Sequence, residues 1–237
     1  MSIKPSVVLV RPQLPENIGL VARAMDNCGL EKLILVSPRE KWPNKLAIQS
    51  AANSKKIILS AKLFYSLDEA LSNFHYVIAT SNRKRLLQKP SQNEFSQLFK
   101  DMPKMKKSAL VFGPENSGLT NKDLMLADII FTINLSKSNT SLNLSHAVLL
   151  FSYKWKEFSK LVDNKKINKT LNTNLSLKKD FRYFMQYLKN ELINVGFLLP
   201  KDKNKNKFDN IQAMFLRSSL NKNEIQTLWG MIKKLRR

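Results

Sequence analysis

The sequence has few of the residues that build disulfides and metal centres. Cys28 is the only cysteine among 237 residues, which excludes an intramolecular disulfide and a multi-cysteine metal site. The two histidines, His75 and His146, lie far apart in the sequence without a carboxylate or cysteine at ligand spacing, so no metal is expected. Apolar runs such as VVLV and AVLLF are too short to span a bilayer. We therefore expect a cytoplasmic protein that binds neither a membrane nor a metal.

Several loops that mark known active sites are also missing. No GxGxxG follows the first predicted strand, and the sequence contains no GK[ST], HExxH or GxSxG. These absences disfavour a Rossmann-type dinucleotide or methyl-donor site, a P-loop, a zinc protease and a serine hydrolase. Whatever chemistry the chain performs must use another kind of site.

Acidic residues are scarce. Asp and Glu number 18 against 40 Lys and Arg, which gives a formal net charge of +22. Such a surplus favours a nucleic acid as partner, because each neutralised phosphate releases condensed counterions. The alternative is codon bias, since most of the cations are lysines and asparagine is abundant. The charge is densest at the C-terminal end, where residues 161–237 hold 17 cations and 6 anions, as expected for a docking appendage.

Hydrophobic patterning predicts alternating strands and helices over residues 6–160. The continuous β-branched run SVVLV is typical of a strand buried on both faces. Strands are predicted at 6–10, 33–36, 76–79, 109–112 and 129–133, with an extended segment or short strand at 56–59. Helices are predicted at 18–29, 43–53, 67–71, 94–101 and 121–127 and from about residue 141. This alternation indicates an α/β fold with a mostly parallel sheet flanked by helices.

The pattern changes after Trp155. Residues 164–176 are mainly Asn, Lys and Thr, which predicts a flexible linker. Three helices are predicted beyond it, at about 177–195, 207–218 and 222–235. We therefore divide the chain into an α/β domain (1–163), the linker (164–176) and a small all-helical C-terminal domain (177–237).

Three polar patches, at 17–23, 112–119 and 140–145, each lie shortly after a predicted strand. In open α/β sheets, ligands bind outside the carboxyl ends of the strands. Ser, Thr and Asn at such junctions also cap helices, so a capping role is the simpler alternative for Asn17 and the patch at 140–145. Helix capping alone does not explain why all three patches occur in this order and with these residues.

Together the patches resemble the signature motifs of the SpoU/TrmH branch of the SPOUT RNA methyltransferases. The segments that carry the resemblance are PENIGLVARAMDNCGL, TSNR, LVFGPENSGLTNKDL, SLNLSHAV, NVGF and NEIQTLWGMI. The resemblance covers essentially the whole chain. It implies a trefoil-knotted α/β domain that works as a homodimer and uses S-adenosylmethionine. The implied reaction is methylation of a ribose 2′-hydroxyl in tRNA, at nucleotide 32 of the anticodon loop.

The resemblance also implies roles for individual residues. The cofactor would be held largely by backbone groups of Thr80, Ser81, Asn82, Gly113, Ile133, Thr140, Ser141 and Leu142. Arg23 matches the family's catalytic arginine; a guanidinium is a poor base because its pKa is above about 12, so Arg23 would grip a phosphate and polarise the hydroxyl. A surface ion pair is the alternative for Arg23.

Asn17, Glu115 and Asn143 match further active-site positions of the family. Glu115 would either orient Arg23 of a partner subunit or order its own loop, and the residues do not separate these roles. Gly113 and Gly118 would permit close backbone approach or a positive φ. The basic loop residues Arg83, Lys84 and Arg85 are candidate RNA contacts, with a solvated loop as the alternative.

Two other functions remain open from the sequence. One is a TrmH-type enzyme that acts on another tRNA position or on ribosomal RNA. The other is an RNA-binding protein that kept the fold and lost catalysis, which the intact Asn17, Arg23, Glu115 and Asn143 disfavour. The C-terminal helices would grip RNA by shape and phosphate, and a dimer-stabilising bundle is their alternative role.

Overall fold

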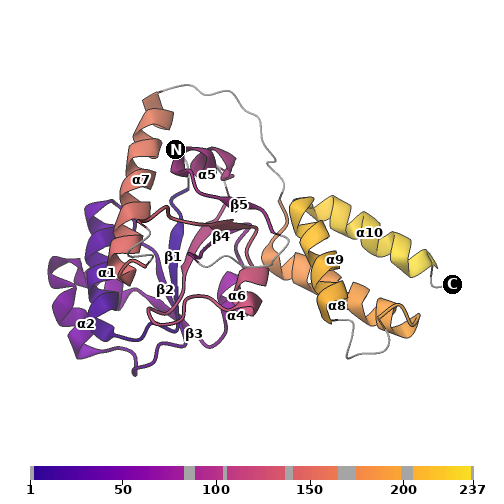
Figure 1. Cartoon of the computed structure of the whole chain (residues 1–237), viewed down its shortest axis with the longest axis horizontal. Coiled ribbons are helices and arrows are strands. Elements are labelled where there is room, and N and C mark those ends of the chain that lie inside the picture. Colours follow the sequence, from indigo (N-terminus) through magenta and orange to yellow (C-terminus); the bar gives the residue numbers. More distant parts are fainter. Residues whose placement is uncertain are drawn as a thin grey trace.

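The computed structural model describes residues 3–82, 89–103, 106–136, 141–164, 175–198 and 205–235. Figure 1 shows an α/β body built from the first two thirds of the chain and a separate group of helices at the C-terminal end. The predicted residues Arg83, Lys84, Arg85 and Thr140 lie outside the described ranges. So does most of the predicted linker, so the division at 163 and 177 stays a prediction.

A single parallel sheet forms the centre of the α/β body. Its strand order is β3-β2-β1-β6-β4-β7-β5, and each neighbouring pair is parallel. The strands are β1 (Ser6–Val10), β2 (Leu33–Val36), β3 (Lys62–Phe64), β4 (Tyr76–Thr80), β5 (Ser91–Gln92), β6 (Ser108–Phe112) and β7 (Ile129–Phe131). β1, β2 and β6 are buried along their whole length, which explains their continuous apolar sequences. The predicted α/β class is confirmed, and the knot stays a prediction.

Two apolar layers cover the two faces of the sheet. The helices are α1 (Pro15–Asn27), α2 (Lys45–Ser50), α3 (Lys55–Leu59), α4 (Leu67–Leu71), α5 (Phe95–Asp101), α6 (Asn121–Met125) and α7 (Leu144–Asn164). Val7 and Leu9 pack with α1, α3, α5 and α7 on one face, while Val8 and Val10 pack with α4 and α6 on the other. Successive residues of a strand point to opposite faces, so β1 contributes to both layers.

Three C-terminal helices, α8 (Lys178–Asn194), α9 (Lys205–Arg217) and α10 (Lys222–Leu235), confirm the predicted helices in this region. They enclose an apolar cluster of their own, which includes Phe184 and Ile225. α8 joins them to the α/β body. Lys178 Nζ lies 2.5 Å from Asp128 Oδ1, and Arg182 forms an ion pair with Asp68. The helical group is therefore docked on the body through the first turns of α8.

Several predicted boundaries were wrong. Residues 56–59 belong to helix α3, and the strand follows at Lys62–Phe64. A short apolar run does not distinguish a helix from a strand, and here Ile57 and Ile58 are buried in the layer that contains α1. The helix predicted at 43–53 is shorter, since α2 covers Lys45–Ser50 and a 3₁₀ turn follows. The two-residue strand β5 was missed, because Ser91 and Gln92 carry no apolar signal.

Candidate active site

A cavity of about 360 Å³ lies where β4, β6 and β7 end. These strands are neighbours in the sheet, with β4 in the middle. Its lining residues come from the last residues of these strands, the segments after them, and the segment that leads into the first turn of α7: Thr80, Ser81, Asn82, Phe112, Gly113, Pro114, Glu115, Asn116, Ser117, Gly118, Leu119, Phe131, Ile133, Leu135, Ser141, Leu142, Leu144 and Ala147. Carboxyl ends of parallel strands are the expected place for a ligand.

The described cofactor residues predicted from the sequence all line this cavity: Thr80, Ser81, Asn82, Gly113, Ile133, Ser141 and Leu142. The structure thus brings together residues that are up to 62 positions apart in the sequence. The cavity also has an apolar wall, formed by Phe112, Leu119, Phe131, Leu135 and Leu144. Phe112, Leu119 and Leu144 lie in the patches singled out in the sequence but had no predicted role, and Phe131 and Leu135 were missed. Phe112 and Phe131 are the last residues of β6 and β7, and their position at the carboxyl end of the sheet was the only available signal for a wall role.

Hydrogen bonds hold the end of β4 between its two neighbours. The Ser81 backbone N–H donates to the Phe131 carbonyl at 3.0 Å, and the Thr132 hydroxyl donates to the Ser81 carbonyl at 2.9 Å. On the other side, the Thr80 hydroxyl donates to the Val111 carbonyl at 3.1 Å. The backbone that lines the cavity is therefore fixed by the sheet itself.

The loop after β6 turns back on itself through two glycines. A Cβ atom on Gly113 would lie 2.4 Å from the Leu119 backbone nitrogen, so only glycine fits between the two limbs of the loop. Gly118 has φ +66°, a conformation that favours glycine, and its N–H donates to the Pro114 carbonyl at 2.8 Å. The close approach and the positive φ expected of these glycines are both present.

A chain of hydrogen bonds connects Glu115, Asn17 and Asn143. Glu115 Oε1 accepts from Asn17 Nδ2 at 2.8 Å, and Glu115 Oε2 accepts from the Gln13 backbone N–H at 3.0 Å. Asn143 Nδ2 donates to Asn17 Oδ1 at 3.2 Å. Asn17 is only 6% exposed, so its amide is fixed from both ends. Three of the four predicted catalytic residues are thus in one hydrogen-bonded group at the edge of the cavity.

The local helix starts differ from prediction at Asn17 and Asn143. α1 begins at Pro15 with Leu14 as its N-cap, since proline is favoured in the first turn; Asn17 therefore lies inside the helix and caps nothing. α7 begins at Leu144, later than the predicted start near Ser141. Asn143 Oδ1 accepts from the Ser145 N–H at 2.8 Å and from its hydroxyl at 2.7 Å. Asn143 thus caps α7 while it holds Asn17.

Arg23, the fourth predicted catalytic residue, lies apart from the hydrogen-bonded group of Glu115, Asn17 and Asn143. It is exposed on α1, about 9 Å along the helix axis from Asn17 and on another face, since a helix rises about 1.5 Å and turns about 100° per residue. Within the described residues, Arg23 neither lines the cavity nor bonds to the Glu115 group. Helices α1 and α7 pack against each other, and their exposed apolar side chains include Leu20, Leu149 and Tyr153, which are 37%, 41% and 50% exposed.

An ion pair that the sequence did not reveal supports the same loop. Arg11, directly after β1, pairs with Asp123 in the first turn of α6. Asp123 also accepts from the Thr120 N–H at 2.8 Å and from its hydroxyl at 2.7 Å. Burial acts to raise the pKa of Asp123, but the hydrogen bonds from Arg11 and Thr120 outweigh it and hold that pKa below its ordinary value. The loop from Gly113 to Leu119 is therefore anchored at its far end.

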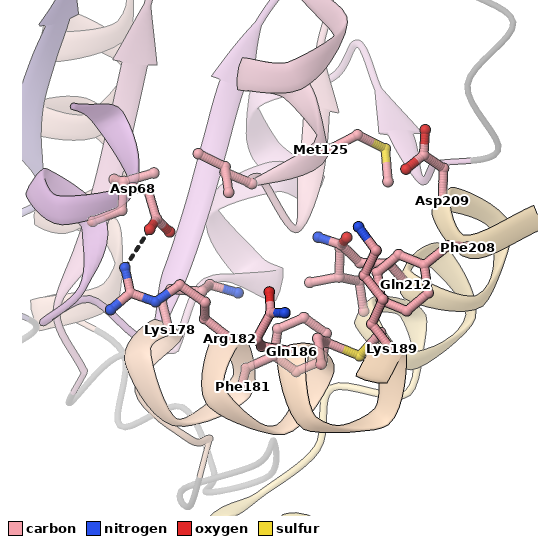
Figure 2. Close-up of a pocket in the computed structure, with 14 residues that line it drawn as sticks. Asp68, Met125, Lys178, Phe181, Arg182, Gln186, Lys189, Phe208, Asp209 and Gln212 are labelled. Carbon is pink, nitrogen blue, oxygen red and sulfur yellow. Dashed lines mark hydrogen bonds and ion pairs between the residues drawn. The ribbon is translucent and has the colours of Figure 1, made fainter. Parts of the chain in front are cut away.

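A second cavity, of about 280 Å³, lies between the α/β body and the C-terminal helices. Figure 2 shows its side chains: Phe181, Gln186 and Lys189 from α8 face Phe208 and Gln212 from α9, and the Asp68–Arg182 ion pair closes one side. It shares no lining residue with the cavity at the strand ends.

Among the described residues, no cluster of His, Cys, Asp and Glu is arranged to hold a metal ion, and no helix has the length and apolarity to cross a membrane.

The parallel sheet, the glycine-bearing loop after β6 and the cavity at the strand ends define a family. The sequence profile of the SpoU rRNA Methylase family matches residues 4–153. This range contains the whole sheet and every residue that lines the cavity. The chain therefore belongs to the SpoU rRNA methylase family and is an RNA methyltransferase by class, as the sequence predicted.

Similarity to individual proteins extends over the C-terminal helices. The chain is 33% identical over 236 residues to the tRNA (cytidine/uridine/adenosine-2′-O-)-methyltransferase TrmJ of Pseudomonas aeruginosa, which covers 95% of this chain and 91% of that protein. The crystal structure of TrmJ from Z. mobilis ZM4 is 32% identical, with a TM-score of 0.86 over 99% of this chain and 100% of the other. The SpoU methyltransferase AviRb from Streptomyces viridochromogenes, solved with AdoMet, has 21% identity and a TM-score of 0.53 over 68% of this chain and 62% of its own, and shows the shared fold.

Proposed function

We propose that the protein transfers a methyl group from S-adenosylmethionine to a ribose 2′-hydroxyl of tRNA, at nucleotide 32 of the anticodon loop. One observation carries the proposal: the cavity at the strand ends adjoins the hydrogen-bonded group of Asn17, Glu115 and Asn143. Relatives named as tRNA 2′-O-methyltransferases support tRNA as the substrate class.

The cavity suits the proposed methyl donor. Its apolar wall, including Phe131 and Leu135, fits an adenine ring, and the backbone around Ser81 and Leu142 offers donors and acceptors to polar edges. Pockets of this kind, mostly apolar with a few placed polar groups, are typical of cofactor sites. The related fold of AviRb was solved with the same donor. When bound, S-adenosylmethionine supplies an activated methyl group on a sulfonium.

We further propose that the active site is completed in a homodimer. Arg23 does not line the cavity of its own chain, and α1 and α7, which pack against each other, expose Leu20, Leu149 and Tyr153. Exposed apolar side chains gathered on adjoining helices indicate an interface. Packing of these faces in a two-fold dimer would bring Arg23 of one subunit to the Glu115 group of the other.

Within that dimer each active-site residue has a separate role. Arg23 binds the phosphate next to the target ribose and polarises the 2′-hydroxyl, because a guanidinium stays protonated. Asn17, held by Glu115 and Asn143, positions the hydroxyl against the methyl group. The released proton passes to that phosphate or to water. Phosphates of the tRNA are contacted by Arg83, Lys84 and Arg85. They are also contacted by the basic C-terminal domain (177–237), which the linker (164–176) connects to the α/β domain. We place this reaction in the cytoplasm.

The test is incubation of the purified protein with labelled S-adenosylmethionine and unmodified tRNA transcripts, followed by mapping of alkali-resistant ribose methylation. We expect methylation at nucleotide 32 that is lost in Arg23→Ala while donor binding is retained. Methylation at another tRNA position or in ribosomal RNA would replace the proposed target with a TrmH-type one. Donor binding without transfer to any RNA would favour a catalytically inactive RNA-binding protein.

A further inference from the structure

The C-terminal helices carry a groove that is separate from the active site. It has a volume of about 580 Å³ and lies between α8 and α10. Its lining residues are Asp180, Tyr183, Gln186, Tyr187, Asn190, Lys222, Ile225, Gln226 and Trp229. None of them lines the cavity at the strand ends. Gln186 also lines the cavity of Figure 2, so the groove and that cavity flank the same helix.

Three aromatic rings face this groove. Tyr187 and Trp229 are stacked, with ring centroids 5.0 Å apart and an angle of 20° between the ring planes. Tyr183, one helical turn before Tyr187, is 56% exposed. Exposed aromatic faces are the surfaces on which unpaired nucleobases stack. The aromatic set therefore offers a platform: Trp229 packs on the apolar core of the helical group, while Tyr183 is exposed beside it.

Amide side chains lie beside the rings. Gln186, Asn190 and Gln226 are exposed and line the same groove, and Gln186 Nε2 donates to Asn190 Oδ1 at 3.1 Å. On α10, Lys222, Gln226 and Trp229 recur at spacings of four and three, which places them on one helix face. Amides present both donors and acceptors, as the edge of a nucleobase does.

The net positive charge of the C-terminal region, in which the groove lies, favours RNA over a protein partner. The Arg182 guanidinium carbon lies 5.2 Å from the centre of the Tyr183 ring, and Lys222 lines the groove with Asp180 as the single lining acid. Residues 161–237 hold 17 cations and 6 anions. Stacking rings inside a basic surface are the combination that binds single-stranded nucleic acid.

We propose that the α8–α10 groove binds an unpaired nucleobase of the RNA substrate. The base stacks on the platform of Tyr183, Tyr187 and Trp229, its edge bonds to Gln226 or Asn190, and Lys222 contacts the adjoining phosphate. This rests on the proposed function only in that RNA is the substrate. Positive charge alone would let the C-terminal helices contact only phosphates. The proposed groove gives them a contact with a base as well.

The test measures binding of the full-length protein to two short probes, without methyl donor. One probe is a single-stranded oligoadenylate, and the other is an abasic ribose-phosphate of the same length and charge. We expect the oligoadenylate to bind about tenfold more tightly, in line with the free energy of stacking one base. Tyr183→Ser and Gln226→Ala should each reduce this preference while the affinity for the abasic probe stays unchanged. Both side chains are exposed, so the fold should survive these substitutions.

Tyr65→Ser is the matched control, because Tyr65 is 87% exposed on the α/β body and should keep the full preference. Equal binding of both probes by the unchanged protein would overturn the proposal. So would an unchanged preference in Tyr183→Ser, or variants that alter only the oligomeric state in light scattering, which would make the groove a protein contact. A base preference in a protein that methylates no RNA would reject the proposed function and leave the groove assignment standing.

Discussion

Glu115 and Asn17 are joined by a hydrogen bond of 2.8 Å between Glu115 Oε1 and Asn17 Nδ2, although they lie 98 residues apart in the sequence. The second carboxylate oxygen accepts from the Gln13 backbone N–H at 3.0 Å. Both carboxylate oxygens of Glu115 therefore accept from the start of α1 and the residues just before it. This carboxylate links the loop after β6 to α1, the helix that carries Arg23.

Glu115→Gln tests that link. A glutamine has one acceptor oxygen, so its NH₂ group would face either the Gln13 N–H or the Asn17 NH₂ and leave a donor unpaired. The lost hydrogen bond to a charged group corresponds to about 1.5–3 kcal/mol, so we expect methyl transfer to tRNA to fall roughly 10- to 100-fold. Glu69→Gln, at an exposed position in the first turn of α4, is the control. Full activity in Glu115→Gln would exclude the positioning role.

Gly113→Ala should weaken donor binding. The added Cβ would lie 2.4 Å from the Leu119 backbone nitrogen, so the loop that lines the cavity must move. We expect the affinity for S-adenosylmethionine, measured by calorimetry, to fall at least about tenfold, a change of about 1.4 kcal/mol. Gly230→Ala has open space around its Cβ in α10 and should leave donor binding intact while it raises helix stability by up to about 1 kcal/mol. Unchanged affinity in Gly113→Ala would show that this loop does not form the donor site.

Mixed dimers test whether Arg23 acts across subunits. Arg23→Ala and Glu115→Gln should each be strongly impaired alone. If each site takes Arg23 from one chain and Glu115 from the other, an equimolar mixture that exchanges subunits regains about a quarter of the wild-type rate, because half of the dimers then hold one intact site. Activity that stays at the average of the two single variants would place both residues in the same subunit.

The ion pair of Arg11 and Asp123 should make stability depend on acidity. The pKa of Asp123 is lower in the folded protein than its ordinary value, so its contribution is present above the unfolded pKa and disappears as the pH falls through the folded one. We expect Asp123→Asn to lower the free energy of unfolding by about 1–2 kcal/mol near neutral pH. The difference from wild type, followed by denaturant unfolding, should shrink below about pH 4. A difference that does not shrink as the pH falls would assign the loss to packing.

Sequence patterning predicted the buried part of the sheet well and its edges poorly. β1, β2 and β6 are buried throughout, so their residues must be apolar and the pattern is unambiguous. At the edges, β3 is largely exposed and β5 has two polar residues. Such strands are fixed by backbone pairing with a neighbour, which leaves no mark on the side chains.

The sequence by itself determined the family and the parallel α/β core, and it indicated the three segments that would meet at the strand ends. Apolar runs and short motifs are local properties, so they can be read without the fold. Only the tertiary structure decided that Glu115 holds Asn17 and that Asn143 both caps α7 and bonds to Asn17. It also decided that Arg23 faces away from its own cavity. These relationships depend on the packing of α1 and α7 against the sheet, which joins groups about a hundred residues apart.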